Sequence, residues 1–477
     1  HDALRSRYTF RRLFVAGLTA LLTNIVGFAV LVIIDIPVIR DLALTTSIGI
    51  SVLIFTKLVL IPVTLSYIGV SPVAARRALA EDTGQKRNVL ARIWGALDRL
   101  TERRAATVTV VLAVVMTVVC TVVMLDLRIG DLDPGAPELR QDSRYNKDGA
   151  YITAHYGLSS DQFVVIMTNP DDGCRLYGTL QLMDQLAQTL RETEGVQATS
   201  SLAQSTRFIT AALNEGSGKW LTISRDQGIT NAAVGAAMIA TPDITNTSCA
   251  VSPLIAYLAD HKADTLNRVL KVSEAFAAKN NSANPKEGPQ FLLAAGSAGV
   301  EAATNIEVER GIFLMYLAVY GATALLCLLT FRSVRATIVA MIPLVMTTII
   351  CKALMVWMGI GLKVATLPVI AVGVGVGVDY ALYLLSVQIT LQRRGATLAE
   401  AYRKSLDFTG RVVALVGLTM AAGVITWAWS PIKFQADMGI LLTFMFLWNM
   451  LGALVLIPAL SHFLLNPQQT KSHLPTY

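Results

Sequence analysis

The chain has 477 residues, of which 53% are hydrophobic and 15% are charged, and its formal net charge is +7. This composition excludes an ordinary soluble globular protein and indicates a chain that crosses a membrane several times. The basic excess does not indicate a nucleic-acid partner, because no basic patch interleaved with aromatic residues accompanies it.

Eight apolar stretches are long enough to cross a bilayer, which takes about 20 residues. We predict spans near residues 14–34, 43–69, 105–126, 311–331, 337–361, 366–390, 412–429 and 438–464. The chain does not begin with Met and runs from a basic segment directly into the first span. No signal peptide is recognisable, and we therefore expect a fragment of a longer protein.

The distribution of Lys and Arg predicts the orientation of these spans. The short loops on one side carry only Arg40, Lys363 and Lys433. The loops on the other side carry most of the basic residues, and the positive-inside rule places them in the cytoplasm. The polar segment 127–310 then lies outside the cytoplasm. We expect a multi-pass protein of the bacterial inner membrane with this large segment in the periplasm.

This topology divides the chain into six parts. They are two spans (1–69), a cytoplasmic amphipathic linker (70–104), one span (105–126), a periplasmic domain (127–310), a five-helix membrane bundle (311–465) and a cytoplasmic tail (466–477). In the linker, Val89, Ile93, Leu97 and Leu100 share one helical face. This spacing suits a helix lying on an anionic membrane surface, and a solvated connector is the alternative.

The periplasmic segment mixes strand and helix patterns. Strands are predicted at 161–168, 221–224 and 290–296, and helices at 174–193, at 253–279 and from about 298 into the next span. Strands separated by helices predict a small α+β sandwich. Cys174 and Cys249 lie in this segment, where an oxidising compartment would allow a disulfide; two free thiols are the alternative. The scattered Cys and His residues show no metal-binding spacing.

Asp379 is the residue around which the functional prediction is built. It lies near the middle of the apolar run 364–391, where insertion of an ionised side chain costs roughly 3 kcal/mol. Acids at membrane depth mark proton or ion paths, so we predict a proton relay made by Asp379 and the neighbouring hydroxyl of Tyr380. The alternative is a structural polar residue that is hydrogen-bonded to another helix.

Three glycines precede this acid, namely Gly373, Gly375 and Gly377. Small residues allow a neighbouring helix to approach closely, so we expect tight helix packing at this point.

Other polar residues in the spans are candidate partners of the relay. Lys57 and Lys352 each lie mid-span, and we hypothesise that at least one pairs with Asp379 or with an acid outside this chain. The alternative is that they extend into an aqueous crevice or toward the membrane surface. Thr419 is a third candidate partner, with a bond to its own helix backbone as the alternative.

Two segments of the chain repeat each other. Segments 11–67 and 411–463 share the tripeptide GLT at 17–19 and 417–419, and the tripeptide LIP at 60–62 and 456–458. Internal repeats of paired spans are typical of secondary transporters.

Together, the run GVGVGVDYALYL at 373–384, the repeated helix pair and the polar domain between two spans resemble the resistance–nodulation–division (RND) superfamily. Within it they resemble the MmpL-like branch, which includes hopanoid and lipid exporters. The resemblance implies an RND fold of which this chain carries helices five to twelve and the second periplasmic porter-like domain. It implies that Asp379 and Tyr380 form one of two Asp-Tyr relay pairs. The other pair would lie in an N-terminal portion that is absent from this sequence.

The resemblance implies proton-driven export of a hydrophobic or lipid-like substrate, with protons as the coupling ion and no other cofactor. Expected partners are membrane lipids, the N-terminal half of the same transporter, and a second copy or a periplasmic accessory protein. The alternative is an RND-like sensor, assembly protein or protein-export accessory protein without pumping activity of its own. An enzyme is disfavoured, because no nucleophile–base pair or metal set is recognisable in the sequence.

Overall fold

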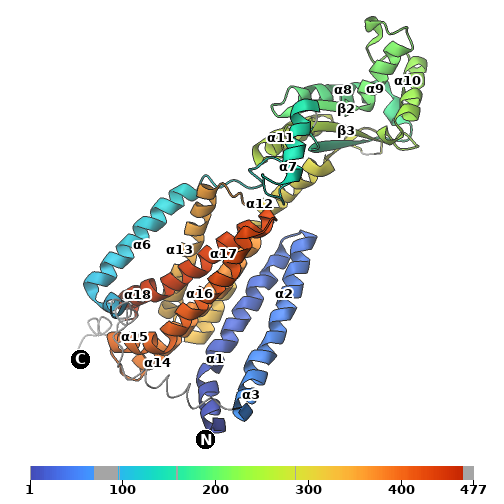
Figure 1. Cartoon of the computed structure of the whole chain (residues 1–477). Helices are drawn as coiled ribbons and strands as arrows, with labels where there is room; N and C mark the ends of the chain where they lie inside the picture. The colour runs from blue at the N-terminus through green and yellow to red at the C-terminus, as the bar shows by residue number, and fades with distance from the viewer. Residues whose placement is uncertain (1, 69–94, 96, 157–158, 285, 466–477) are drawn as a thin grey trace, which may run out of the picture. The chain divides into compact units, whose positions relative to one another are not determined.

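The computed structural model describes residues 2–68, 95, 97–156, 159–284 and 286–465, and these fall into two compact units (Figure 1). The first comprises His1–Leu127, Glu307–Ser430 and Phe434–Tyr477, and we call it the membrane unit. The second comprises Arg128–Ile306 and Pro431–Lys433, and we call it the α+β unit. The predicted linker 70–104 and tail 466–477 lie largely or wholly outside the described residues.

The described part of the membrane unit consists of helices joined by short connections. Its α-helices are α1 (Asp2–Ala29), α2 (Pro37–Phe55), α3 (Ile61–Ile68), α6 (Arg103–Met124), α12 (Gly296–Phe331), α13 (Val334–Met358), α14 (Leu367–Arg393), α15 (Leu398–Ser405), α16 (Arg411–Ile425), α17 (Lys433–Leu451) and α18 (Ile457–Leu464). Short 3-10 or π segments are η1 (Val30–Ile33), η2 (Thr56–Leu60), η3 (Arg99–Thr101), η7 (Leu406–Gly410), η8 (Thr426–Trp429) and η9 (Gly452–Leu456). The first turns of α12 belong to the α+β unit.

Within the described residues, 7 helices are long and apolar enough to cross a membrane. They are Pro37–Thr64, Arg103–Met124, Gly296–Phe331, Val334–Met358, Leu367–Arg393, Leu398–Trp429 and Lys433–Leu464. The first predicted span, 14–34, corresponds to a shorter apolar helix, Gly17–Ile33. The expected polytopic α-helical architecture is therefore confirmed, and the first predicted span falls, except for its last residue, within α1 and η1, which together run from Asp2 to Ile33.

Helix α14 is the most enclosed of the spans. Other helices cover most of its apolar length, and it packs along α1, α13 and α15. Helix α6, in contrast, exposes a row of valines and leucines, as expected for a face in contact with lipid. An acid on α14 is thus placed inside the helical bundle.

The sequence repeat has a structural counterpart. The helix pairs α2–α3 and α17–α18 are each interrupted by a π segment, η2 or η9, which ends at the leucine of the repeated LIP tripeptide. Pro62 and Pro458 explain this position, because proline cannot donate the backbone hydrogen bond and its ring clashes with the carbonyl four residues earlier. In both repeats the preceding helix also ends in a 3-10 turn, η1 or η8.

The α+β unit contains one four-stranded sheet. Its strands are β1 (Gln162–Thr168), β2 (Val196–Ser201), β3 (Val251–Leu258) and β4 (Gln290–Ala295), in the order β2-β3-β1-β4 with antiparallel neighbours. Its further helices are α7 (Arg144–Tyr156), η4 (Gly173–Arg175), α8 (Tyr177–Arg191), α9 (Leu202–Ala212), η5 (Gly218–Trp220), α10 (Gln227–Ala240), η6 (Pro242–Ile244) and α11 (Ala263–Asn280).

Helices α8 and α11 connect β1 to β2 and β3 to β4, and both pack on the sheet. This is the ferredoxin-like split βαβ arrangement, with α9 and α10 inserted between β2 and β3. The core joins the inward residues of the strands to those of the helices; it includes Phe163, Val165, Met167, Leu180, Met183, Leu254 and Val269. The predicted α+β sandwich is confirmed, with predicted strands 161–168 and 290–296 at β1 and β4.

The predicted helix at 253–279 is wrong in its first part. Residues 251–258 form strand β3, and the helix begins only at Ala263. The burial alternates strictly along β3, as a strand with one face on a core requires. Pro253 is tolerated because β2 ends opposite Leu254, so at Pro253 the strand has a partner on one side only.

The predicted strand at 221–224 is also wrong. This segment is an irregular connection between η5 and α10, and the amide of Thr222 bonds to the carbonyl of Trp220 nearby. Four residues that alternate between apolar and polar do not form a β-strand when no neighbouring strand pairs with them. The second strand of the sheet is β2, whose polar sequence gives no apolar strand pattern.

Candidate functional site

The candidate site lies around Asp379 of α14. The side chain is near the middle of this helix and is partly buried. Tyr380, the next residue, is 2% exposed, and its hydroxyl has no hydrogen-bond partner among the described residues. Because consecutive residues of a helix point about 100° apart, the two side chains leave α14 in different directions.

Helix α1 supplies the partners of the Asp379 carboxylate. The Asn24 amide nitrogen Nδ2 lies 3.0 Å from Oδ2, and the Thr23 hydroxyl Oγ1 lies 3.3 Å from Oδ1. Asn24 can donate to this oxygen in either protonation state of the acid. The two carboxyl oxygens therefore face two different donors, both from α1.

The Thr23 hydroxyl has competing acceptors. Its oxygen is 2.7 Å from the carbonyl oxygen of Ala20 and 3.2 Å from that of Thr19, in addition to the contact with Asp379. A hydroxyl has one proton, so it can donate fully to only one of these acceptors at a time. It can donate to an ionised Asp379, or donate to Ala20 and accept from a protonated Asp379. The geometry serves both protonation states.

Glycines allow α1 and α14 to approach at this point. A Cβ at Gly375 would lie 3.0 Å from Asn24 Oδ1, and a Cβ at Gly27 of α1 would lie 3.1 Å from the carbonyl oxygen of Ala371. Each contact is tighter than a side chain normally accepts. The close crossing of the two backbones brings the short side chains of Thr23 and Asn24 within reach of the acid.

The other two glycines of the run face α17. A Cβ at Gly373 would collide with Met445, and a Cβ at Gly377 would lie 2.3 Å from Asn449 Nδ2. Asn449 is 2% exposed and donates to the carbonyl oxygen of Gly373 at 2.8 Å. The three glycines thus place helices on two sides of the segment that carries Asp379.

The three proposed relay partners have other surroundings. Lys352 lies with its ammonium 4.2 Å from the ring centre of Tyr316, and Thr419 donates to carbonyls of its own helix at 2.9 and 3.0 Å. Lys57, in η2, is exposed and is near enough to Asp379 for a charge interaction. Among the described residues neither lysine forms an ion pair with Asp379, and the carboxylate contacts Thr23 and Asn24 instead.

Sequence reasoning missed Thr23, Asn24 and Asn449. A signal for them was present, because each interrupts an otherwise apolar run in a predicted span. Buried polar groups in a span need partners within the bundle, so such positions point inward. No group of three or more His, Cys, Asp or Glu that could hold a metal ion occurs in the described part of the chain.

The model of the MMPL family matches residues 153–466. The chain belongs to the MMPL family. Among curated proteins none matches this sequence. A solved structure described as SecDF in a super-membrane-facing form is similar in fold, with a TM-score of 0.51 and 12% sequence identity. The similarity covers 98% of this chain and 50% of that one, so the chain spans half the length of this structural relative.

This membership confirms the resemblance to the MmpL-like branch of the RND superfamily. Proteins of the MMPL family are RND-type membrane transporters rather than enzymes. The match includes α14 and most of the α+β unit. The SecDF likeness, at this identity, extends only to the fold.

We expect removal of the α1 donors to impair the predicted proton relay at Asp379 in a graded way. Asn24→Leu removes the closer donor and should slow proton-coupled transport more than Thr23→Val, which keeps the shape and removes only the hydroxyl. Thr23→Ser retains the hydroxyl and should retain transport. Initial transport rates of the natural protein in vesicles would measure this order, and equal rates in all three variants would contradict it.

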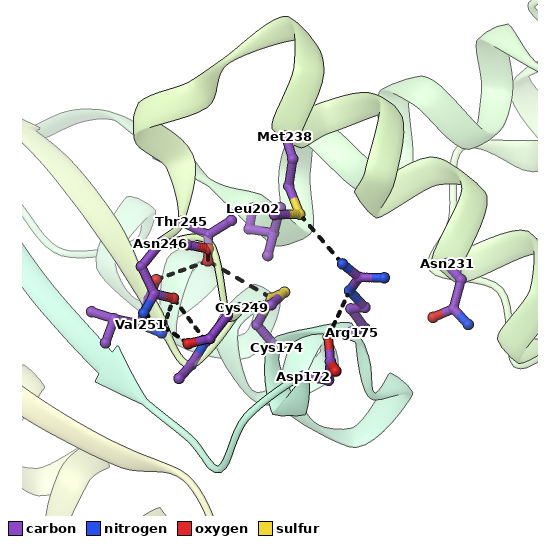
Figure 2. The surroundings of a disulfide bond; sticks show 12 residues. Asp172, Cys174, Arg175, Leu202, Asn231, Met238, Thr245, Asn246, Cys249 and Val251 are labelled. Carbon is purple, nitrogen blue, oxygen red and sulfur yellow. Dashed lines mark hydrogen bonds and ion pairs between the residues drawn. A yellow bond between two sulfur atoms is a disulfide. The ribbon is translucent and has the colours of Figure 1, made fainter.

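The α+β unit of this MMPL-family protein has a cross-linked corner. Cys174 and Cys249 form a disulfide between η4 and the turn that precedes β3, in which Cys249 lies two residues before the strand (Figure 2). The backbone amide of Cys174 also donates to the carbonyl oxygen of Cys249 at 3.0 Å. The Asn246 side chain accepts from the amides of Ala250 and Val251, closing the turn before the strand. The corner thus fixes the end of the α9–α10 insertion.

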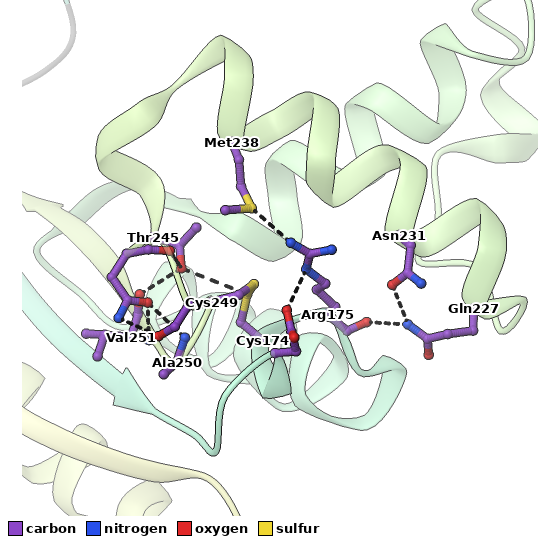
Figure 3. A network of polar contacts seen from close by, with 12 residues as sticks. Cys174, Arg175, Gln227, Asn231, Met238, Thr245, Cys249, Ala250 and Val251 are labelled. Carbon is purple, nitrogen blue, oxygen red and sulfur yellow. Dashed lines mark hydrogen bonds and ion pairs between the residues drawn. A yellow bond between two sulfur atoms is a disulfide. The ribbon is translucent and has the colours of Figure 1, made fainter.

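Arg175 connects the same corner to α10. Its guanidinium lies between Asp172 and Met238 (Figure 2), at 3.4 Å from the Asp172 carboxylate and 3.9 Å from the Met238 sulfur, and the contact with Met238 is also drawn in Figure 3. Its carbonyl oxygen accepts from the Gln227 amide at 3.0 Å, and Gln227 also donates to Asn231. One residue therefore holds both ends of α10 beside the disulfide.

We expect the disulfide to stabilise the α+β unit. The double variant Cys174→Ser with Cys249→Ser should lose up to roughly 4.5 kcal/mol of unfolding free energy, the chain-entropy limit for a loop of this length. Denaturant unfolding of the full-length protein, followed by hydrogen exchange of β3 peptides, would measure the loss. Cys120→Ser, at a free cysteine in α6, is the matched control and should change nothing.

Proposed function

We propose that this MMPL-family protein takes part in proton-driven export of a hydrophobic or lipid-like substrate out of the bacterial inner membrane. The observation that carries the proposal is the carboxyl group of Asp379, enclosed in the bundle and hydrogen-bonded by two donors from a second helix. Protons are the coupling ion, and no other cofactor is required. The large α+β unit lies in the periplasm in this proposal.

The proposed cycle begins with protonation of Asp379 from the periplasmic side. The charge disappears, and the Thr23 hydroxyl turns from the carboxylate to the carbonyl of Ala20, which lies 2.7 Å away. The attraction between α14 and the donors of α1 weakens. Two packings of α1 against α14, one for each protonation state, would form the bistable element.

The driving force is sufficient for a change of this kind. One elementary charge that crosses a potential of 100 mV gains about 2.3 kcal/mol, which can bias two packings that differ by a few kcal/mol. Helix α12 carries the change toward the α+β unit, because one continuous helix contributes residues to both units. A substrate path in that unit would then open and close in step with proton movement.

A second candidate function is that of an RND-like sensor or protein-export accessory protein. The fold likeness to SecDF makes it the competing proposal. A binding-only protein would not need proton exchange at Asp379. Retained biological activity in Asp379→Asn would therefore favour this second function over the transporter.

The proposal is tested by proton flux in vesicles that contain the natural full-length protein. A pH-sensitive dye inside the vesicles would report proton movement when lipids or other hydrophobic compounds are added one at a time. We expect at least one such compound to start a proton flux that vesicles without the protein lack. Proton flux that no hydrophobic compound changes, with intact folded protein, would contradict coupled export.

A further inference from the structure

His261 is a buried histidine in the turn between β3 and α11, far along the chain from the Asp379 relay. It is 3% exposed, and its Nδ1 lies 3.2 Å from Asp161 Oδ2. The other ring nitrogen, Nε2, is buried and has no hydrogen-bond partner among the described residues. A histidine so enclosed is fixed in position, while only one of its two nitrogens is bonded.

Carboxylates from three other segments of the unit act on this ring, and Asp161 is the one in direct contact with it. Asp161 directly precedes β1, Asp131 lies in the segment before α7, and Glu301 lies in the first part of α12; the charge of each acts on His261. In the turn of His261 itself, Lys262 lies 3.6 Å from Asp260. Arg128 forms an ion pair with Asp264 at the start of α11. The cations that flank the cluster thus have acidic partners of their own.

Two of the acids lie near the ends of the main segment of the α+β unit. The α+β unit begins at Arg128 and its main segment ends at Ile306, so Asp131 and Glu301 lie beside its two main chain connections. The carbonyl of Asp131 accepts from the Ala263 amide at 3.0 Å. At the start of α12, Ser297 Oγ accepts from the Gln162 amide at 3.2 Å. The histidine therefore lies where both connections meet the sheet.

We propose that His261 is a protonation switch that clasps the two chain connections of the α+β unit. As an imidazolium it attracts Asp161, Asp131 and Glu301 together and holds the segment after Arg128, the start of β1 and the first turns of α12. As a neutral ring it no longer attracts these carboxylates, and the connections loosen. The pH of the compartment that surrounds the unit would then set the stiffness of its attachment.

The electrostatics support this direction. Burial by itself lowers the pKa of His261, but the hydrogen bond to Asp161 and the charges of Glu301, Asp161 and Asp131 outweigh burial, so the pKa lies above its ordinary value. We call the state in which His261 holds the two chain connections closed, and the state in which they are loosened opened. A raised pKa of His261 in the closed state means that the closed state binds the proton more tightly than the opened state. The clasp is then fully formed below the ordinary histidine pKa, and it is lost as the pH rises through the raised pKa.

The test is hydrogen exchange of the full-length protein in lipid nanodiscs, from about pH 5.5 to about pH 8.5, after correction for the intrinsic exchange rate. Peptides that cover 128–133, 159–164 and 296–303 report the clasp. We expect their protection to fall as the pH rises, by about tenfold for each unit by which the closed-state pKa exceeds that of the opened state. Peptides of α8 serve as the internal reference and should show no such change.

Variants assign the effect to this histidine. His261→Gln should make protection of the three peptides independent of pH, and Asp161→Asn should move the loss of protection to lower pH. His155→Gln, at an exposed histidine of α7, should behave as the natural protein does. If His261→Gln does not fold, the pH dependence of protection in the natural protein and in Asp161→Asn tests the proposal. Protection that is independent of pH in the natural protein, or unshifted by Asp161→Asn, would overturn the proposal.

Discussion

Asp379→Asn is expected to abolish proton-coupled export while leaving the protein folded. The amide has nearly the shape of the carboxyl, so Thr23 and Asn24 can still pack against it, but it cannot take up or release a proton. We expect transport by the natural full-length protein to fall by about 100-fold or more, the lower range for loss of a positioned proton-transfer group. Substrate-dependent acidification or alkalinisation of vesicles would measure the loss.

Two further substitutions make this result specific. Asp379→Glu retains the acid on a longer side chain and should retain partial transport, with a changed distance to the α1 donors. Asp41→Asn removes an exposed acid of α2 and should leave transport unchanged. Coupled transport by Asp379→Asn at the natural rate would refute the role of this residue.

Gly377→Ala is expected to destabilise the membrane unit. The added methyl group would lie 2.3 Å from the Asn449 amide nitrogen and 2.8 Å from Leu344, so Asn449 must move and lose its bond to the carbonyl of Gly373. Insertion of a methyl group into a packed site costs roughly 1–3 kcal/mol. A lower unfolding temperature in a membrane mimetic would report it.

The matched control for this substitution is Gly423→Ala in α16. No heavy atom lies within 4 Å of a Cβ at that position. The control should therefore unfold at the same temperature as the natural protein. An equal effect of both substitutions would mean that the close contact of Gly377 with α17 does not contribute to the stability of the membrane unit.

Much of this fold could be predicted because burial in lipid leaves a strong pattern in sequence. Long apolar runs located the spans, and a single acid inside one of them located α14. The strand patterns of β1 and β4 were equally readable. The pattern of strand β3 was not readable. Its apolar residues and Pro253 closely precede α11, so the two-residue repeat of the strand and the helical repeat of α11 together resemble one long helix.

The partners of Asp379 could not be predicted by the same reasoning. A sequence shows that Thr23 and Asn24 are polar residues in a span, but not which helix they face. Charge favoured the lysines as partners, whereas the fold brings α1 against α14 through glycines that permit a close crossing. Helix pairing in the bundle, rather than charge, decides which side chains reach the acid.

The most direct measurement is an infrared titration of the natural protein and of Asp379→Asn in lipid. A protonated carboxyl group has a carbonyl stretch well separated from that of a carboxylate, so proton exchange at a single acid appears in a difference spectrum. We predict a carboxyl band that disappears as the pH rises in the natural protein and is missing in Asp379→Asn. The same band in both proteins, or no carboxyl change in the natural one, would contradict a relay at Asp379.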